Sequence, residues 1–235
     1  MKLPESNPLV NLEMALKARF SSADGLISVE ARLTDNSWLL SDDCRLTGGF
    51  AFYLWFAGAH KSDFVITLGG YHPKFAVPKH YPEVPRLGFN WRVTSKVTIK
   101  GESYFALTSA AVMAGGLLEA SYKSGNLKAW FKAWADFLIQ WKPFFYNIGI
   151  GVSVGVSYRL KVNLLFGTVT KTFKAELGAD LEIEGPKFGG KATINWWVIS
   201  FTVKFGSQGG PDRDALKWSA FASGFLPSPD EIHGA

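Results

Sequence analysis

The chain has 235 residues, 47% hydrophobic and 19% charged, which excludes a disordered protein and leaves material for one large or two small domains. The net charge is +5, but lysines and arginines are scattered singly, so we expect a solvated basic surface and no nucleic-acid partner. The single cysteine, Cys44, excludes an internal disulfide and a cysteine-based metal site.

The first twenty residues do not predict a signal peptide, because Glu5, Glu13, Lys17 and Arg19 interrupt their apolar positions. No run reaches 18 apolar residues, so the sequence predicts no transmembrane helix and argues against a membrane partner. It contains no Walker or dinucleotide-binding motif, and we expect no cofactor. The cellular compartment is left undetermined.

Apolar and polar residues alternate from the N-terminus onward, which is the pattern of β-strands with two different faces. Residues 12–20 and 27–34 alternate in this way. Residues 50–56 are apolar on both faces, which predicts a central strand covered on both sides.

Residues 69–86 differ from the rest, since this stretch holds four of the 11 prolines and two of the 4 histidines. Proline lacks an N–H and restricts the residue before it, so the stretch predicts a long loop. Residues 109–116 are rich in alanine and end in two glycines, and they predict a short helical turn.

Alternation resumes in residues 127–137, although Trp130 and Trp134 fall on the mostly polar face. It is clearest in residues 148–164, which predict one long strand with glycines and polar residues opposite its apolar face. Glycines weaken a strand, so we expect a neighbour to pack closely on them. Residues 173–183 alternate again.

Residues 194–205 are apolar on both faces, so we expect both faces of the sheet to be covered there. Residues 207–210 suit a linker. The segment after it predicts an amphipathic helix, because Pro211 and two acids open it and Trp218, Phe221 and Phe225 share one stripe.

Together these elements predict an all-β fold. We expect an antiparallel meander of about ten to twelve strands, closed or strongly curled like a barrel, with a short C-terminal helix. The domain interpretation is a β-meander domain over 1–206, containing the loop 69–86, followed by a linker, amphipathic helix and tail over 207–235.

No motif in the sequence has the structural context that catalysis would require. Residues 151–155 match Gly-x-Ser-x-Gly, but a hydrolase needs that serine on a strand-to-helix turn, and here it lies inside a strand. His72, His80 and Glu83 lack the spacing of a standard metal motif, so a structural role of the histidines within the loop is favoured. We expect no catalytic residues and no metal.

A ligand, if one binds, is expected beside the loop, where rings and polar tips gather. Any single tryptophan is more readily explained as part of the core, and a ring-lined cavity is the sharper alternative. The candidate ligand-binding residues are Tyr71, His72, His80, Tyr81, Arg86, Trp91, Trp130 and Trp134.

Several stretches resemble one family. They include Gly-Gly-Tyr-His-Pro-x-Phe at 69–75, the run from His80 to Trp91, Gly101-Glu102-x-Tyr104-Phe105, and the segments 135–144 and 150–158. The chain resembles an uncharacterised domain-of-unknown-function family. That resemblance implies a module near the C-terminal end of long bacterial and fungal proteins, excised here from a larger protein, and it implies no activity.

The leading hypothesis is a non-enzymatic β-sheet module for assembly or partner binding, because alternation continues without a convergent acid, base or nucleophile. The alternative is a carrier or enzyme for a hydrophobic small molecule or lipid held in a Trp-lined cavity. A membrane β-barrel or pore is the third hypothesis. The expected partners are therefore such a molecule, the rest of a larger protein, or other subunits.

Overall fold

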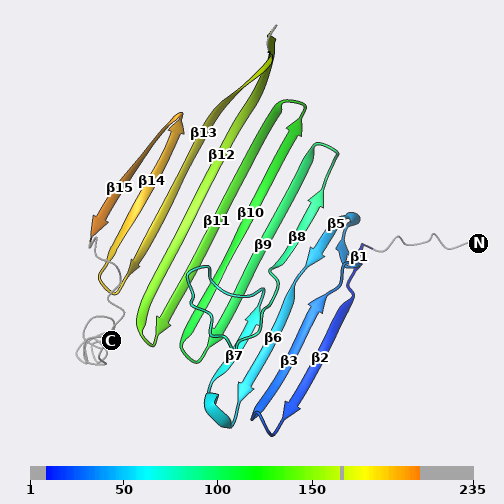
Figure 1. Cartoon of the computed structure of the whole chain (residues 1–235), viewed down its shortest axis with the longest axis vertical. Coiled ribbons are helices and arrows are strands. Elements are labelled where there is room, and N and C mark those ends of the chain that lie inside the picture. The colour runs from blue at the N-terminus through cyan, green and yellow to red at the C-terminus, as the bar shows by residue number, and fades with distance from the viewer. Residues whose placement is uncertain (1–8, 165–166, 207–235) are drawn as a thin grey trace, which may run out of the picture.

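A computed structural model describes residues 9–164 and 167–206 and shows one antiparallel sheet of fifteen strands (Figure 1). The elements are β1 (Val10–Asn11), β2 (Met14–Ser21), β3 (Leu26–Leu33), β4 (Trp38–Leu39), β5 (Ser41–Thr47), β6 (Gly49–Trp55), the 3₁₀ turn η1 (Gly58–His60), β7 (Phe64–Leu68), β8 (Leu87–Arg92), β9 (Val97–Thr108), β10 (Ala111–Ser124), β11 (Leu127–Trp141), β12 (Phe144–Leu164), β13 (Gly167–Gly185), β14 (Gly189–Trp197) and β15 (Ile199–Gly206).

The sheet has a simple half and a branched half. From β9 to β15 each strand pairs with the next in the chain, as a hairpin series does. The other edge of β9 is shared, because β7 pairs with its C-terminal part and β8 with its N-terminal part. From there β7 continues to β6, β3 and β2, while β8 continues to β5, β4 and β1. The connection 69–86 joins these two branches.

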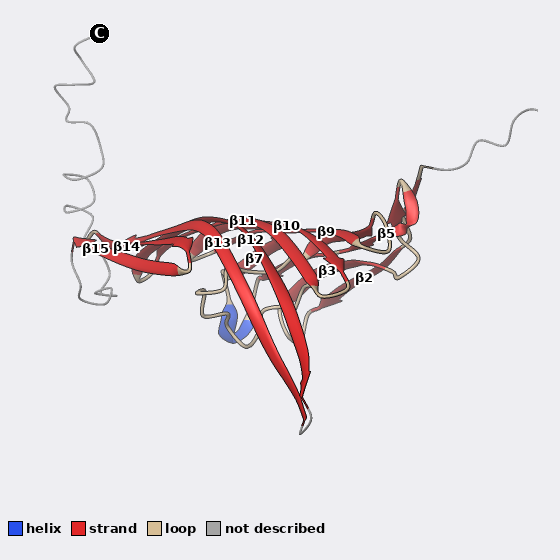
Figure 2. Cartoon of the chain, turned by 90° about the horizontal axis from the view of Figure 1, so that it is seen from above, coloured by secondary structure: helices blue, strands red, loops and turns tan. Residues whose placement is uncertain are grey.

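That connection leaves the end of β7, in the interior of the sheet, and lies across one face of the sheet (Figures 1 and 2). It contains no helix or strand, as its prolines predicted. We call residues 69–86 the proline loop and the face beneath it the loop face. The turn η1 lies on the same side of the sheet in Figure 2.

The buried core lies between the proline loop and the sheet. One cluster surrounds Met113 and Leu138, which are fully buried, and a second surrounds Val65 and Trp55. Tyr71 and Phe75 of the loop pack against both clusters. The loop therefore supplies the cover that a second sheet or a helix layer supplies in other folds.

The opposite face, which we call the apolar face, is uncovered. Residues paired across antiparallel strands share a face, so Ile150 lies beside Ala135 and Leu181 on this side. No described segment covers it over β9–β15 in Figure 2. The large side chains of this face that are at least 36% exposed include Phe105, Leu118, Phe131, Ile148, Ile150, Val152, Val154, Val156, Tyr158, Phe173, Leu177, Leu181, Trp196, Ile199, Phe201 and Val203.

Glycines occur within the long strand β12 because tryptophan rings of β11 pack against their backbone, where a side chain would not fit. A Cβ on Gly155 would lie 2.1 Å from the ring of Trp130, and one on Gly149 would lie 2.6 Å from the ring of Trp134. Both rings therefore lie against backbone on the loop face. The expectation that a neighbour packs closely on these glycines is confirmed.

The prediction of a closed, barrel-like sheet is wrong. The terminal strands β2 and β15 pair with β3 and β14 alone among the described strands, so the sheet is open. Alternation did not distinguish the two cases, because residues alternate between faces in a barrel and in an open sheet alike. The predicted C-terminal helix lies outside the described residues, in 207–235.

Two local predictions are also wrong. Residues 109–116 belong mostly to β10, because pairing with β9 and β11 outweighs the weak helical preference of a few alanines. Residues 194–205 form parts of two strands that meet at Trp197, whose φ is 61°. Trp196 and Trp197 are 66% and 64% exposed, so the two faces are not both covered there.

The seating of tryptophan on glycine can be tested with Gly155→Val. The new side chain must displace the Trp130 ring, and overpacking of this kind costs about 1–3 kcal/mol of unfolding free energy. Urea unfolding followed by circular dichroism measures the change. Ser157→Val, two residues along the same face, is the control, since Ser157 already carries a Cβ. Equal urea midpoints of unfolding for the two variants would contradict the packing of Trp130 on Gly155.

Candidate functional site

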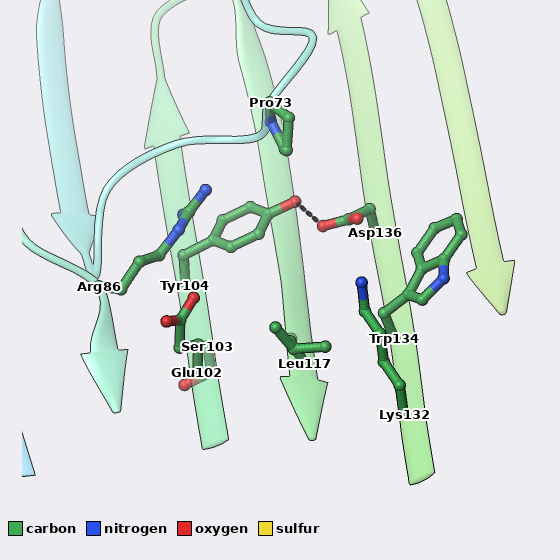
Figure 3. Close-up of a pocket in the computed structure, with 10 residues that line it drawn as sticks. Pro73, Arg86, Glu102, Ser103, Tyr104, Leu117, Lys132, Trp134 and Asp136 are labelled. Atoms are coloured by element: carbon green, nitrogen blue, oxygen red, sulfur yellow. Dashed lines mark hydrogen bonds between the residues drawn. The ribbon is translucent and has the colours of Figure 1, made fainter. Parts of the chain in front are cut away.

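Arg86 ties the two ends of the proline loop to the sheet. Its Nη1 donates to the carbonyl of Gly69 at 3.0 Å, and its Nη2 donates to that of Tyr71 at 2.6 Å. The guanidinium lies 4.0 Å from the centre of the Tyr104 ring, a cation–π contact. Tyr104 in turn donates from its hydroxyl to Asp136 Oδ1 at 2.6 Å (Figure 3). Burial, reinforced by Asp136, raises the pKa of Tyr104.

Asp63 anchors the other side of the loop. Its Oδ1 accepts from the hydroxyls of Tyr81 at 2.8 Å and Ser109 at 2.5 Å, and its Oδ2 lies 2.8 Å from His80 Nε2. Burial opposes ionisation of this carboxyl, but the hydrogen bonds outweigh burial, so the pKa of Asp63 is lowered. His80 also stacks on His60, with ring centres 3.7 Å apart.

His72 is a buried structural residue, only 3% exposed. Its Nδ1 accepts from the backbone N–H of Lys74 at 3.0 Å, and burial lowers its pKa, so the ring is held neutral. Its Nε2 is buried and has no hydrogen-bond partner among the described residues. This geometry suits a residue that shapes the loop.

Lys74 links the loop to β13 by ion pairs with Glu182 and Glu184, the second at 3.5 Å. Glu182 also accepts from Lys191 at 2.9 Å and from Asn147 at 3.3 Å. Burial opposes its ionisation, but these donors outweigh burial and lower the pKa of Glu182 to about 2. The loop is therefore held at both ends and at its tip.

A groove runs along the loop face from the proline loop toward the far end of β11. Its first part has a volume of about 330 Å³ and its second part about 540 Å³, and the two share Lys132 and Trp134. We call the whole the loop-face groove. Figure 3 shows the first part, where Trp134 and Lys132 project from β11 beside Asp136. The second part includes Trp130, Lys128, Lys174, Glu119, Glu176 and Asp180.

Several polar side chains of this groove form hydrogen bonds or ion pairs with other protein groups. Asp136 accepts from Tyr104, and Asp180 accepts from Nε1 of Trp134 at 3.2 Å. Lys174 is paired with Glu176. Among the described residues, no three or more His, Cys, Asp or Glu side chains converge as a metal site would require. The arrangement suits binding of a ligand through stacking and hydrogen bonds.

The apolar face has a hollow of its own, with a volume of about 840 Å³. Its floor is made of small residues, and larger aliphatic side chains rise around it. The floor comprises Gly116, Ala133, Ala135, Ala179 and Ala192, and the surround includes Leu118, Ile150, Val152, Leu181 and Ile194. This hollow and the loop-face groove lie on opposite faces of the same strands.

Comparison with known proteins identifies a family. A model described as "Family of unknown function (DUF6603)" matches residues 1–233. The chain belongs to this family. No curated protein and no solved structure matches it. Among the described residues, no helix is long and apolar enough to cross a membrane.

The structure brings together only part of the predicted ligand-binding set. Arg86, Trp130 and Trp134 line the loop-face groove. Tyr71, His72 and Tyr81 also fasten the loop, and together with Arg86 they line a separate hollow of about 540 Å³ at the proline loop. His80 is held by Asp63, and Trp91 is paired with Ile99 on the apolar side of the sheet.

Sequence reasoning missed Tyr104, Lys132 and Asp136, which complete the groove. A weak signal existed for Asp136 and Lys132, because each is a charged residue on the same strand face as Trp134. Tyr104 lies in a stretch that resembles the family, but the resemblance assigns no role to it. Nothing in the sequence places its hydroxyl beside Asp136, 32 residues away.

The Asp63 anchor can be tested with Asp63→Asn. At pH 7 we expect the free energy of unfolding to fall by about 1–3 kcal/mol, because the amide disrupts the acceptor set used by Tyr81, Ser109 and His80. Denaturant unfolding measures this loss.

The pH dependence gives a second signature of the same anchor. A carboxyl whose folded pKa lies below its ordinary value of 3.8 contributes stability above that value, and the contribution is lost as pH falls through the folded pKa. The stability difference between wild type and Asp63→Asn should therefore shrink as the solution is acidified below about pH 4. Asp42→Asn, at an exposed acid, is the control. A difference that stays constant with pH would contradict the anchor.

Proposed function

We propose that this chain is a non-enzymatic β-sheet module for assembly, in which the apolar face packs against the same face of a second copy. The observation that carries the proposal is the absence of cover over the large apolar side chains of β9–β15 in the described part of the chain. Burial of such a surface is favourable and non-directional.

The size of the face supports a stable interface. The seven strands β9–β15 at about 4.8 Å spacing, and the eleven residues Ile148–Tyr158 at about 3.3 Å each, span roughly 1,000 Å². The largest apolar patch of a typical monomer covers about 300–600 Å². A standard interface buries about 800 Å² on each partner.

The chemistry of the face favours a second copy as the partner. The apolar positions of β10, β11, β14 and β15 contain no Lys, Arg, Asp or Glu, so two copies can meet without opposing like charges. In a two-fold interface the same patch meets itself, which an apolar surface without charges permits. Two such sheets would pack about 10 Å apart as in a β-sandwich.

Val152→Lys tests the proposal at the centre of the face. Val152 is 45% exposed in the single chain and lies opposite Ala133 and Ala179, so a lysine there is compatible with folding but leaves a charge buried in the interface. We expect wild type to sediment as a dimer at micromolar concentration. The variant should dissociate at least about 100-fold more readily, since burying an unpaired charge costs several kcal/mol.

The matched control is Ser153→Lys, the next residue, whose side chain lies on the loop face. It should leave the dimer intact, and circular dichroism should show that both variants keep their β-structure. A wild-type monomer at all concentrations would overturn the proposal. So would native mass spectrometry that finds a lipid or other apolar molecule on a monomer, because that result favours a carrier of hydrophobic ligands.

A further inference from the structure

We infer that the loop-face groove binds a neutral oligosaccharide, through the rings of Trp130 and Trp134 and the polar side chains around them. This site lies on the face opposite the proposed assembly surface, and the inference does not depend on that assembly. It rests on three observations: how the two rings are seated, how the groove is charged, and how far apart the rings lie.

Both rings are fixed as platforms. Trp130 lies against Gly155, and Trp134 lies against Gly149 and Gly151, where any Cβ would collide with the ring. Nε1 of Trp134 is further held by Asp180 at 3.2 Å. Each tryptophan is only partly buried, so a ring with one face on the backbone turns its other face outward. Little side-chain freedom remains to be lost when a ligand stacks there.

The outer face of an aromatic ring is electron-rich and attracts weakly positive hydrogen atoms. The C–H groups on one face of a sugar ring have that character and a matching flat shape. Sugar hydroxyls both donate and accept hydrogen bonds, so they need donors and acceptors close together around the ring. The groove provides lysine ammonium groups, carboxylates and the hydroxyls of Ser153, Ser157 and Thr172 around its rings.

The balance of charge indicates a neutral ligand. Lys128, Lys132 and Lys174 in the second part of the groove are offset by Glu119, Glu176 and Asp180. A nucleic-acid groove would instead carry an excess of cations to neutralise phosphates. A lipid tail would meet charged groups on both sides of each ring, at a desolvation cost that the opposite, apolar face does not impose.

Lys132 is the clearest free donor. It lies between the two tryptophans on β11, and its ammonium group forms no hydrogen bond or ion pair with another described residue. The ammonium groups of Lys128 and Lys174 lie 5.9 and 5.4 Å from the Trp130 ring centre, where they can move to a hydroxyl of a stacked ligand. Donors are thus present beside Trp130 and at the middle of the platform pair.

The spacing of the rings indicates a chain of sugars. Trp130 and Trp134 are four residues apart on one strand, about 13 Å along β11. One sugar ring cannot contact both platforms. The groove also continues past Trp134 to Tyr104 and Arg86 at the proline loop, which lengthens the surface along which an oligosaccharide can lie.

The test is isothermal titration of the full chain with a panel of neutral hexasaccharides, linked β-1,4, β-1,3 and α-1,4, with a heparin hexasaccharide as a polyanion. We expect at least one neutral member to bind, and binding to change little between 50 and 300 mM salt. Trp130→Ala and Trp134→Ala should each weaken that binding about 10-fold or more, as loss of one stacking platform does for other ring-stacked ligands.

Two controls keep the outcome specific. Trp197→Ala removes a tryptophan that is 64% exposed and does not line the groove, and it should bind as wild type does. Val154→Lys, on the apolar face and outside the groove lining, should also bind normally even where it disrupts assembly. Binding of heparin alone, binding of no neutral member, or equal affinity in wild type and both groove variants would each overturn the inference.

Discussion

The unbroken register of β9–β15 is the constraint on which the rest of this structure depends. Each of these strands pairs with its neighbours so that the apolar residues of one face mostly meet apolar residues, and a shift of one position would send them to the opposite face. Trp130 and Trp134 reinforce the register, because each ring reaches across to glycines of the next strand. The same register therefore creates both the apolar face and the loop-face groove.

A single sheet has two faces, and this chain covers only part of one. The proline loop buries a core around Met113, Leu138 and Val65, and its anchors at Arg86 and Asp63 hold that cover in place. The opposite face has no such cover among the described residues. This asymmetry separates the two proposed roles in space: assembly through the apolar face and ligand binding in the groove.

The contacts of the proline loop show that its histidines and tyrosines have structural roles. Its histidines and tyrosines are candidate ligand-binding residues in the sequence, although a structural role is favoured there for the histidines. In the structure His72 and Tyr81 face inward, and the loop forms one end of the groove mainly through Arg86 and Pro73. Several of these polar tips are used in fastening the loop, and the proposed oligosaccharide site therefore lies mainly on the neighbouring strands β11 to β13.

The sequence by itself determined the all-β class, the long strand over 148–164, the proline loop and the position of Trp130 and Trp134 on a polar face. These features follow from local rules: side chains alternate along a strand, and proline excludes regular structure. Only the tertiary structure decided that the sheet stays open, that 109–116 is a strand, and that Tyr104 meets Asp136 and Trp134 meets Asp180. The physical reason is that alternation specifies which face a residue occupies, whereas closure, cover and cross-strand contact depend on which strands become neighbours.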